Sequence, residues 1–152
     1  MTRKNLILIA AGGSLALLLG AWGFQALGYA PCKMCIWQRW PHGAAILIGA
    51  AALVIPLALL ALLGAAAAAT TGAIGIYHTG VEKGWWTGPT TCTSGDISEM
   101  SSEDLFDSIM AAPLVRCDEI PWDMFGLSMA GWNAAISAVL VLLWLAAWRA
   151  KA

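Results

Sequence analysis

The segment IWQRWPHGAAILIGAAALVIPLALLALLGAAAAATTGAIGIYHT, residues 36–79, is a long apolar stretch with one permanent charge, Arg39. It is long enough for two transmembrane helices of about 20 residues each. Pro56 lies near its middle, and proline interrupts the hydrogen bonding of a helix interior. We therefore predict one span at about residues 36–54 and another at about 60–79, separated by a break around 55–59.

Two further apolar stretches bring the predicted number of spans to four. Residues 5–27 carry no charge, exceed the apolar core of a signal peptide and lack a clear cleavage site. Residues 128–148 are equally free of charge. Because 60% of the residues are hydrophobic and only 11% are charged, we expect an all-α membrane protein with one domain, residues 1–152. The nine tryptophans lie near the predicted span ends and are expected to form an interfacial belt.

The placement of charge predicts the orientation of the chain. Arg3 and Lys4 precede the first span, and Arg149 and Lys151 follow the last. The positive-inside rule and the even number of spans therefore place both termini in the cytoplasm. All nine acidic residues lie between residues 82 and 123, together with only two basic residues. Because no basic face is indicated, we do not expect nucleic-acid binding.

This topology leaves two loops on the outer face, a short one at about residues 28–35 and a long one at about 80–127. All four cysteines fall on these loops: Cys32, Cys35, Cys92 and Cys117. A short amphipathic helix is expected in the long loop, because four apolar residues share one helical face: Leu105, Phe106, Ile109 and Met110. Such a helix can lie on the membrane surface or pack on a small core of the loop, and the pattern does not distinguish the two.

Cys32 and Cys35 form a Cys-X-X-Cys motif, whose thiols can close a small ring. Cys35 immediately precedes the second predicted span, where free backbone N–H groups and the helix dipole favour a thiolate. Arg39 follows four residues later on the same helical face and can place its guanidinium near that sulfur. A buried arginine is costly, which makes it a functional candidate, and the alternative is an arginine that extends to the interface.

Cys92 and Cys117 admit three interpretations. They can form an ordinary stabilising disulfide, or a labile one that exchanges with an external thiol. Zinc ligation is the third, although the paired spacing of most four-cysteine zinc sites is missing. Two disulfide-capable pairs beside a membrane suggest a relay from a soluble dithiol. Because no further cysteine remains as acceptor, a lipid-soluble two-electron oxidant such as a quinone fits the next step.

Four segments of the chain resemble the bacterial disulfide bond formation protein B (DsbB) family. They are PCKMCIWQRWP at residues 31–41, YHTGVE at 77–82, GPTTCT at 88–93, and WDMFGLSM at 122–129 after Cys117. The resemblance extends over nearly the whole chain. It implies a four-helix bundle in the bacterial inner membrane, expected to be monomeric. Such a protein reoxidises a periplasmic DsbA-like thioredoxin-fold oxidase and passes the electrons to ubiquinone or menaquinone.

The resemblance also implies roles for individual residues. By position, Cys92 resembles the cysteine that forms the mixed disulfide with the soluble partner, and Cys117 is its mate. Cys32 and Cys35 resemble the pair beside the quinone, with Cys35 in contact with it. Arg39 matches the quinone-site arginine of the family. No metal ligand is expected.

The two histidines of the chain, His42 and His78, lie in the second and third predicted spans. His78 falls near a histidine found at the outer end of the third span in some family members, so we include it as a candidate quinone-site residue. A structural role at a helix end is the alternative. His42 lies one turn past Arg39, and no motif supports a role for it.

Two other functions are conceivable for a membrane protein with these cysteines. A quinone reductase of the vitamin K epoxide reductase type also combines a four-helix bundle with Cys-X-X-Cys, but its motif normally lies late in the bundle, unlike Cys32. The other rival is a non-catalytic membrane protein whose disulfides only cross-link its loops.

Overall fold

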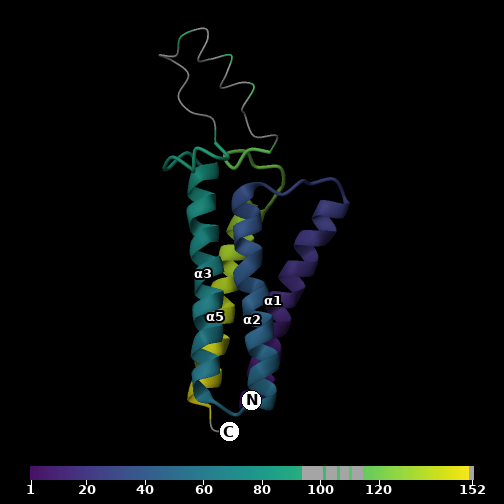
Figure 1. The fold of residues 1–152 in the computed structure, drawn as a ribbon, viewed down its shortest axis with the longest axis vertical. Coiled ribbons are helices and arrows are strands. Elements are labelled where there is room, and N and C mark those ends of the chain that lie inside the picture. Colours follow the sequence, from purple (N-terminus) through teal and green to yellow (C-terminus); the bar gives the residue numbers. More distant parts are fainter. Residues whose placement is uncertain (94–100, 102–105, 107–109, 111–114, 151–152) are drawn as a thin grey trace.

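The computed structural model describes residues 1–93, 101, 106, 110 and 115–150. Four long helices dominate this part of the chain: α1 (Arg3–Ala26), α2 (Lys33–Val54), α3 (Ala58–Glu82) and α5 (Met129–Arg149). They stand side by side in one bundle, with both termini at one end (Figure 1). Around the bundle, α1 packs on α2, α2 on α3, α3 on α5, and α5 on α1. The α1–α2 and α3–α5 connections therefore meet at the opposite end from the termini.

The four helices coincide with the four apolar segments to within a few residues. The break between α2 and α3 falls at residues 55–57, inside the predicted interval around Pro56. By length and composition, α1, α3 and α5 are suited to cross a membrane. Helix α2 has 22 residues but is not among them, and its first turns carry polar side chains such as Gln38 and Arg39.

Side-chain caps fix the start of three helices. Thr2, Cys32 and Ser128 cap α1, α2 and α5, each accepting a hydrogen bond from a backbone N–H of the first turn. At α2 the capping group is a thiol, because the N–H of Cys35 donates to Sγ of Cys32 over 3.2 Å. The first cysteine of the motif is thus held by the helix that carries the second.

Small residues let α3 approach α5 closely. A Cβ atom at Gly72 would lie 3.2 Å from Cβ of Ser137, and one at Gly64 would lie 2.5 Å from the ring of Trp144. Trp144 is completely buried. The predicted interfacial belt is therefore wrong for Trp144, because the space left by Gly64 admits its ring into the core. Such small-residue contacts are typical of helix packing in membranes.

The outward surfaces of the helices are apolar. Large apolar side chains are exposed along all four helices, among them Leu8, Leu19, Leu47, Leu63, Ile76 and Leu142. Several polar side chains are instead buried between the helices: Ser14, Gln38, His42, Thr71, His78 and Ser137. Apolar surface outside and polar groups inside are expected of a bundle surrounded by lipid.

A short β-hairpin lies directly before α5, and the all-α prediction did not include it. Strands β1 (Asp123–Met124) and β2 (Leu127–Ser128) pair in antiparallel fashion. Both residues of the turn, Phe125 and Gly126, have positive φ angles, of 53° and 77°, as a tight two-residue hairpin requires. The predicted amphipathic helix falls largely on residues 102–105 and 107–109, outside the described residues.

Candidate functional site

The two cysteine pairs meet at the end of the bundle opposite the termini. Cys92 and Cys117 form a disulfide, whereas Cys32 and Cys35 are free thiols. The disulfide leaves no thiolates at Cys92 and Cys117 for zinc, so it removes that alternative for the bonded state. Cys32, Cys92 and Cys117 belong to one buried cluster, and Cys35 packs against it. Both redox-capable pairs are therefore in one packed unit although they come from different loops.

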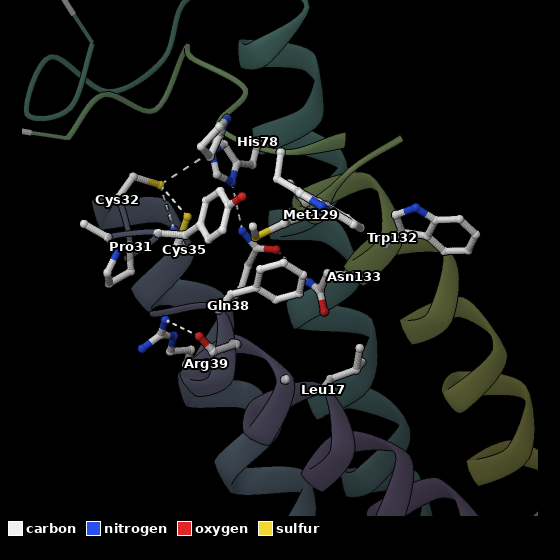
Figure 2. A pocket seen from close by; sticks show the side chains of 18 of the residues that line it. Leu17, Pro31, Cys32, Cys35, Gln38, Arg39, His78, Met129, Trp132 and Asn133 are labelled. Atoms are coloured by element: carbon white, nitrogen blue, oxygen red, sulfur yellow. Dashed lines mark hydrogen bonds between the residues drawn. The ribbon is translucent and has the colours of Figure 1, made fainter. Parts of the chain in front are cut away.

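The sulfur atoms of Cys32 and Cys35 lie 2.7 Å apart, within hydrogen-bonding contact (Figure 2). Cys32 precedes the first residue of α2 and is only 4% exposed. The hydrogen bond with Cys35, reinforced by burial, raises the pKa of Cys32 well above its ordinary value. Cys35, in the first turn of α2, is the more exposed of the two thiols.

We expect alkylation of the reduced protein to distinguish the thiol of Cys35 from that of Cys32. Near neutral pH, iodoacetamide should modify Cys35 faster than Cys32, because the thiolate is the nucleophile and Cys32 has the raised pKa and the more buried sulfur. Mass spectrometry of the peptides quantifies each site. Equal modification of both cysteines, or faster modification of Cys32, would contradict this expectation.

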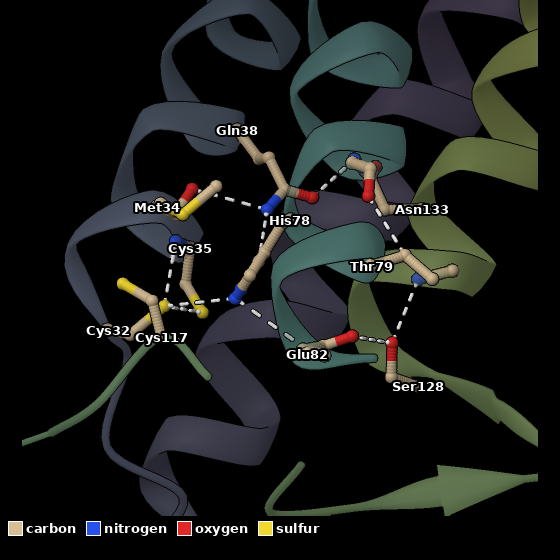
Figure 3. Close-up of polar contacts among 12 residues, drawn as sticks. Cys32, Met34, Cys35, Gln38, His78, Thr79, Glu82, Cys117, Ser128 and Asn133 are labelled. Carbon is tan, nitrogen blue, oxygen red and sulfur yellow. Dashed lines mark hydrogen bonds and ion pairs between the residues drawn. The ribbon is translucent and has the colours of Figure 1, made fainter. Parts of the chain in front are cut away.

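His78 on α3 lies beside the thiol pair. Its Nε2 is 3.6 Å from Sγ of Cys32 and 3.8 Å from a carboxylate oxygen of Glu82. The amide nitrogen of Gln38 is identified by its contact with the Met34 carbonyl, and the same nitrogen donates to Nδ1 of His78 over 3.0 Å. A neutral His78 must therefore carry its proton on Nε2, directed toward Cys32 and Glu82 (Figure 3).

This protonation state bears on metal binding. Sγ of Cys32, Sγ of Cys35 and Nε2 of His78 all lie within 4.8 Å of one another, a spacing that a metal ion can occupy. Ligation by Nε2 would require the proton on Nδ1, and Gln38 would have to reverse its amide and lose its bond to Met34. The hydrogen bonds around His78 thus favour thiol chemistry over metal ligation.

A cavity of about 330 Å³ adjoins the thiol pair and is lined by residues of all four helices and of the segment that precedes α5. Most of its lining is apolar, including Leu17, Phe24, Trp122, Met129, Trp132 and Ile136. A few polar side chains also line it, including Cys35, Gln38, Arg39 and His78 (Figure 2). His42 is part of the same lining. An apolar cavity of this size with few polar groups is suited to a small ring-shaped ligand.

Arg39 lines the cavity but forms its hydrogen bonds with α1. Its guanidinium donates to the side-chain oxygen of Gln25 over 2.7 Å and to the carbonyl of Ala21 over 3.3 Å. Nε of Arg39 is buried and has no partner among the described residues. Arg39 therefore joins α2 to α1, and its Nε–H remains an unused donor.

Several polar residues of the site were not predicted from the sequence. Asn133 on α5 links Gln38 to His42, and Ser128 donates to the carboxylate of Glu82. A polar amide inside an apolar segment is costly unless it has a partner. That rule could have singled out Gln38 and Asn133, but it could not have identified their partners.

The arrangement agrees with a known family. The family model of the disulfide bond formation protein DsbB matches residues 3–147, nearly the whole chain. No curated protein and no solved structure is significantly similar to the chain. A helical bundle in which three of the described helices are suited to cross a membrane is consistent with this family. The chain therefore belongs to the DsbB family of membrane disulfide bond formation proteins.

Proposed function

We propose that this protein is a quinone-dependent thiol oxidase of the bacterial inner membrane. It reoxidises a periplasmic DsbA-like dithiol oxidase and passes the electrons to ubiquinone or menaquinone, which supports disulfide formation in other proteins. One observation carries the proposal. Cys32, Cys92 and Cys117 share one buried cluster against which Cys35 packs, and Cys32 and Cys35 also line an apolar cavity.

In this proposal all four helices cross the membrane and form one domain, residues 1–152. The 22 residues of α2 are sufficient for a span, and α2 packs between α1 and α3. Arg3 and Lys4 begin α1 and Arg149 ends α5, so they lie at the end that holds the termini. The positive-inside rule assigns that end to the cytoplasm. The cysteines are then periplasmic, where a soluble partner can reach them.

Electrons pass through the two pairs by thiol–disulfide exchange. A thiolate of the reduced partner attacks Cys92, breaking its bond to Cys117, and the partner's second thiolate then releases Cys92 as the partner becomes oxidised. The reduced Cys92 and Cys117 next reduce a Cys32–Cys35 disulfide and close their own again. Two electrons and two protons now reside on Cys32 and Cys35.

The residues around the cavity fit a quinone as the next acceptor. The unused Nε donor of Arg39 is suited to a carbonyl oxygen, and the apolar walls are suited to the ring. A bound quinone supplies a site for two electrons and two protons. Cys35 lines the cavity, where its sulfur can reach a bound quinone. His78 holds an N–H group at Cys32, where it stabilises charge that develops on that sulfur.

A turnover assay tests the proposal. The purified protein is mixed with a reduced DsbA-like dithiol and a water-soluble benzoquinone, and the loss of quinone absorbance is recorded. We expect catalytic reduction of one quinone for each dithiol oxidised. If protein with intact disulfides shows no turnover, the proposal is wrong, and disulfides that only cross-link the loops become the better account.

A further inference from the structure

The orientation of the Asn133 amide is determined by its neighbours. One terminal atom of this amide lies 3.2 Å from the carbonyl of Thr71 and 2.7 Å from the side-chain oxygen of Gln38. The oxygen of Gln38 is itself identified, because the nitrogen of that amide donates to the Met34 carbonyl. Carbonyl oxygens only accept hydrogen bonds, so this atom of Asn133 is the nitrogen. The other atom, Oδ1, therefore faces His42.

This orientation fixes the proton of His42. Nε2 of His42 lies 2.8 Å from Oδ1 of Asn133, so a neutral His42 carries its proton on Nε2 and donates it there. Nδ1 is then a lone-pair acceptor. It is buried and has no partner among the described residues, while the whole side chain is only 3% exposed. Leaving a buried acceptor without a donor is unfavourable. A ligand bound in the adjacent cavity can supply the hydrogen-bond donor that Nδ1 lacks.

His42 and Arg39 line the same cavity, and each has one buried nitrogen without a partner among the described residues. They are three residues apart on α2, which places them on one helical face, and both line the cavity. Arg39 has an unused donor, whereas His42 has an unused acceptor. A donor can serve the oxygen of a quinone or of a hydroquinone. An acceptor can serve only the hydroxyl group of the hydroquinone, because a quinone oxygen carries no hydrogen.

We propose that His42, held by Asn133, is a specificity-determining residue that recognises the reduced cofactor through a hydrogen bond from its hydroxyl group to Nδ1. The inference rests on the quinone-dependent function proposed above and adds a residue to it. A hydrogen bond formed only in the reduced state strengthens hydroquinone binding relative to quinone binding. It thereby makes the bound quinone a stronger oxidant of Cys32 and Cys35.

Two substitutions separate the two nitrogens of His42. His42→Gln places an amide N–H near the position of Nε2 and keeps the bond to Asn133, but offers no acceptor near Nδ1. His42→Asn places an oxygen near the position of Nδ1 and gives up the bond to Asn133. The second variant is therefore the matched control for the first. Both are made in a Cys32→Ala/Cys35→Ala background, so that no electrons pass between protein and ligand.

The measurement is the ratio of two dissociation constants, for a water-soluble benzoquinone and for its hydroquinone. Quenching of tryptophan fluorescence under anaerobic conditions reports binding, since Trp122 and Trp132 line the cavity. We expect His42→Gln to weaken hydroquinone binding relative to quinone by about tenfold, equivalent to about 30 mV for a two-electron couple. His42→Asn should keep the ratio within about threefold of the parent protein, because a hydroxyl acceptor remains.

The outcomes distinguish this inference from the function on which it rests. If the parent protein binds neither form, the quinone-dependent function fails and the inference fails with it. If the parent binds both forms and His42→Gln leaves the ratio unchanged, only the role of His42 is overturned. Should either variant fold poorly, nitrogen NMR of histidine-labelled parent protein decides. Hydroquinone, but not quinone, must shift the unprotonated Nδ1 resonance of His42, and no such shift overturns the inference.

Discussion

Replacement of Cys35 by serine is expected to abolish quinone reduction, lowering turnover by at least about a thousandfold, as loss of a reacting nucleophile does in other enzymes. Serine cannot form a disulfide with Cys32, so the pair can no longer give up two electrons. The Cys92–Cys117 disulfide remains in place, and it can still accept electrons from the partner once. We therefore expect one equivalent of partner to be oxidised, followed by no further reaction.

Rapid mixing with excess reduced partner distinguishes this outcome from unfolding. Acid quenching and thiol alkylation count the oxidised partner per molecule of protein, and quinone absorbance is followed in parallel. A Cys92→Ser variant is the matched control, because it should lack even the single equivalent while retaining Cys32 and Cys35. Continued turnover of Cys35→Ser would contradict the proposed electron path. The loss of its single equivalent would show that the two pairs cannot act separately.

The second large effect is expected on stability, from Gly64→Val. A Cβ atom at this position would lie 2.5 Å from the ring of Trp144, and the ring is completely buried. Trp144 cannot move aside without disturbing the packing of α3 on α5. We expect the free energy of unfolding to fall by about 3 kcal/mol, at the upper end for overpacked cores. Unfolding in detergent micelles, followed by circular dichroism during heating or SDS titration, measures the change.

Gly12→Val provides the control for this substitution. Gly12 lies in α1, where a Cβ atom would meet nothing within 4 Å. Both changes add the same β-branched side chain to a helix, so the difference between them isolates the contact with Trp144. We expect Trp144→Leu to recover part of the stability lost in Gly64→Val. Equal destabilisation at Gly12 and Gly64 would show that helix propensity, rather than packing, accounts for the effect.

The sequence by itself determined the helices and the closeness of Cys32 and Cys35. Apolar segments of span length can satisfy their backbone in lipid only as helices or closed barrels, and Pro56 marked the turn between α2 and α3. Cys32 and Cys35 are three residues apart, so their proximity is a local property of the chain. The family resemblance carried by these motifs was confirmed by the match over residues 3–147.

Only the tertiary structure decided which polar groups meet. Gln38, His78 and Asn133 lie on α2, α3 and α5, and their hydrogen bonds depend on how these helices are rotated in the bundle. Helix rotation is set by side-chain packing, such as the fit of Trp144 against Gly64, which hydrophobic patterning does not encode. For the same reason the sequence placed His42 one turn from Arg39 but left it without a role. Its partner Asn133 is distant in the chain, and only the packing of α5 beside α2 and α3 fixes which nitrogen of His42 carries the proton.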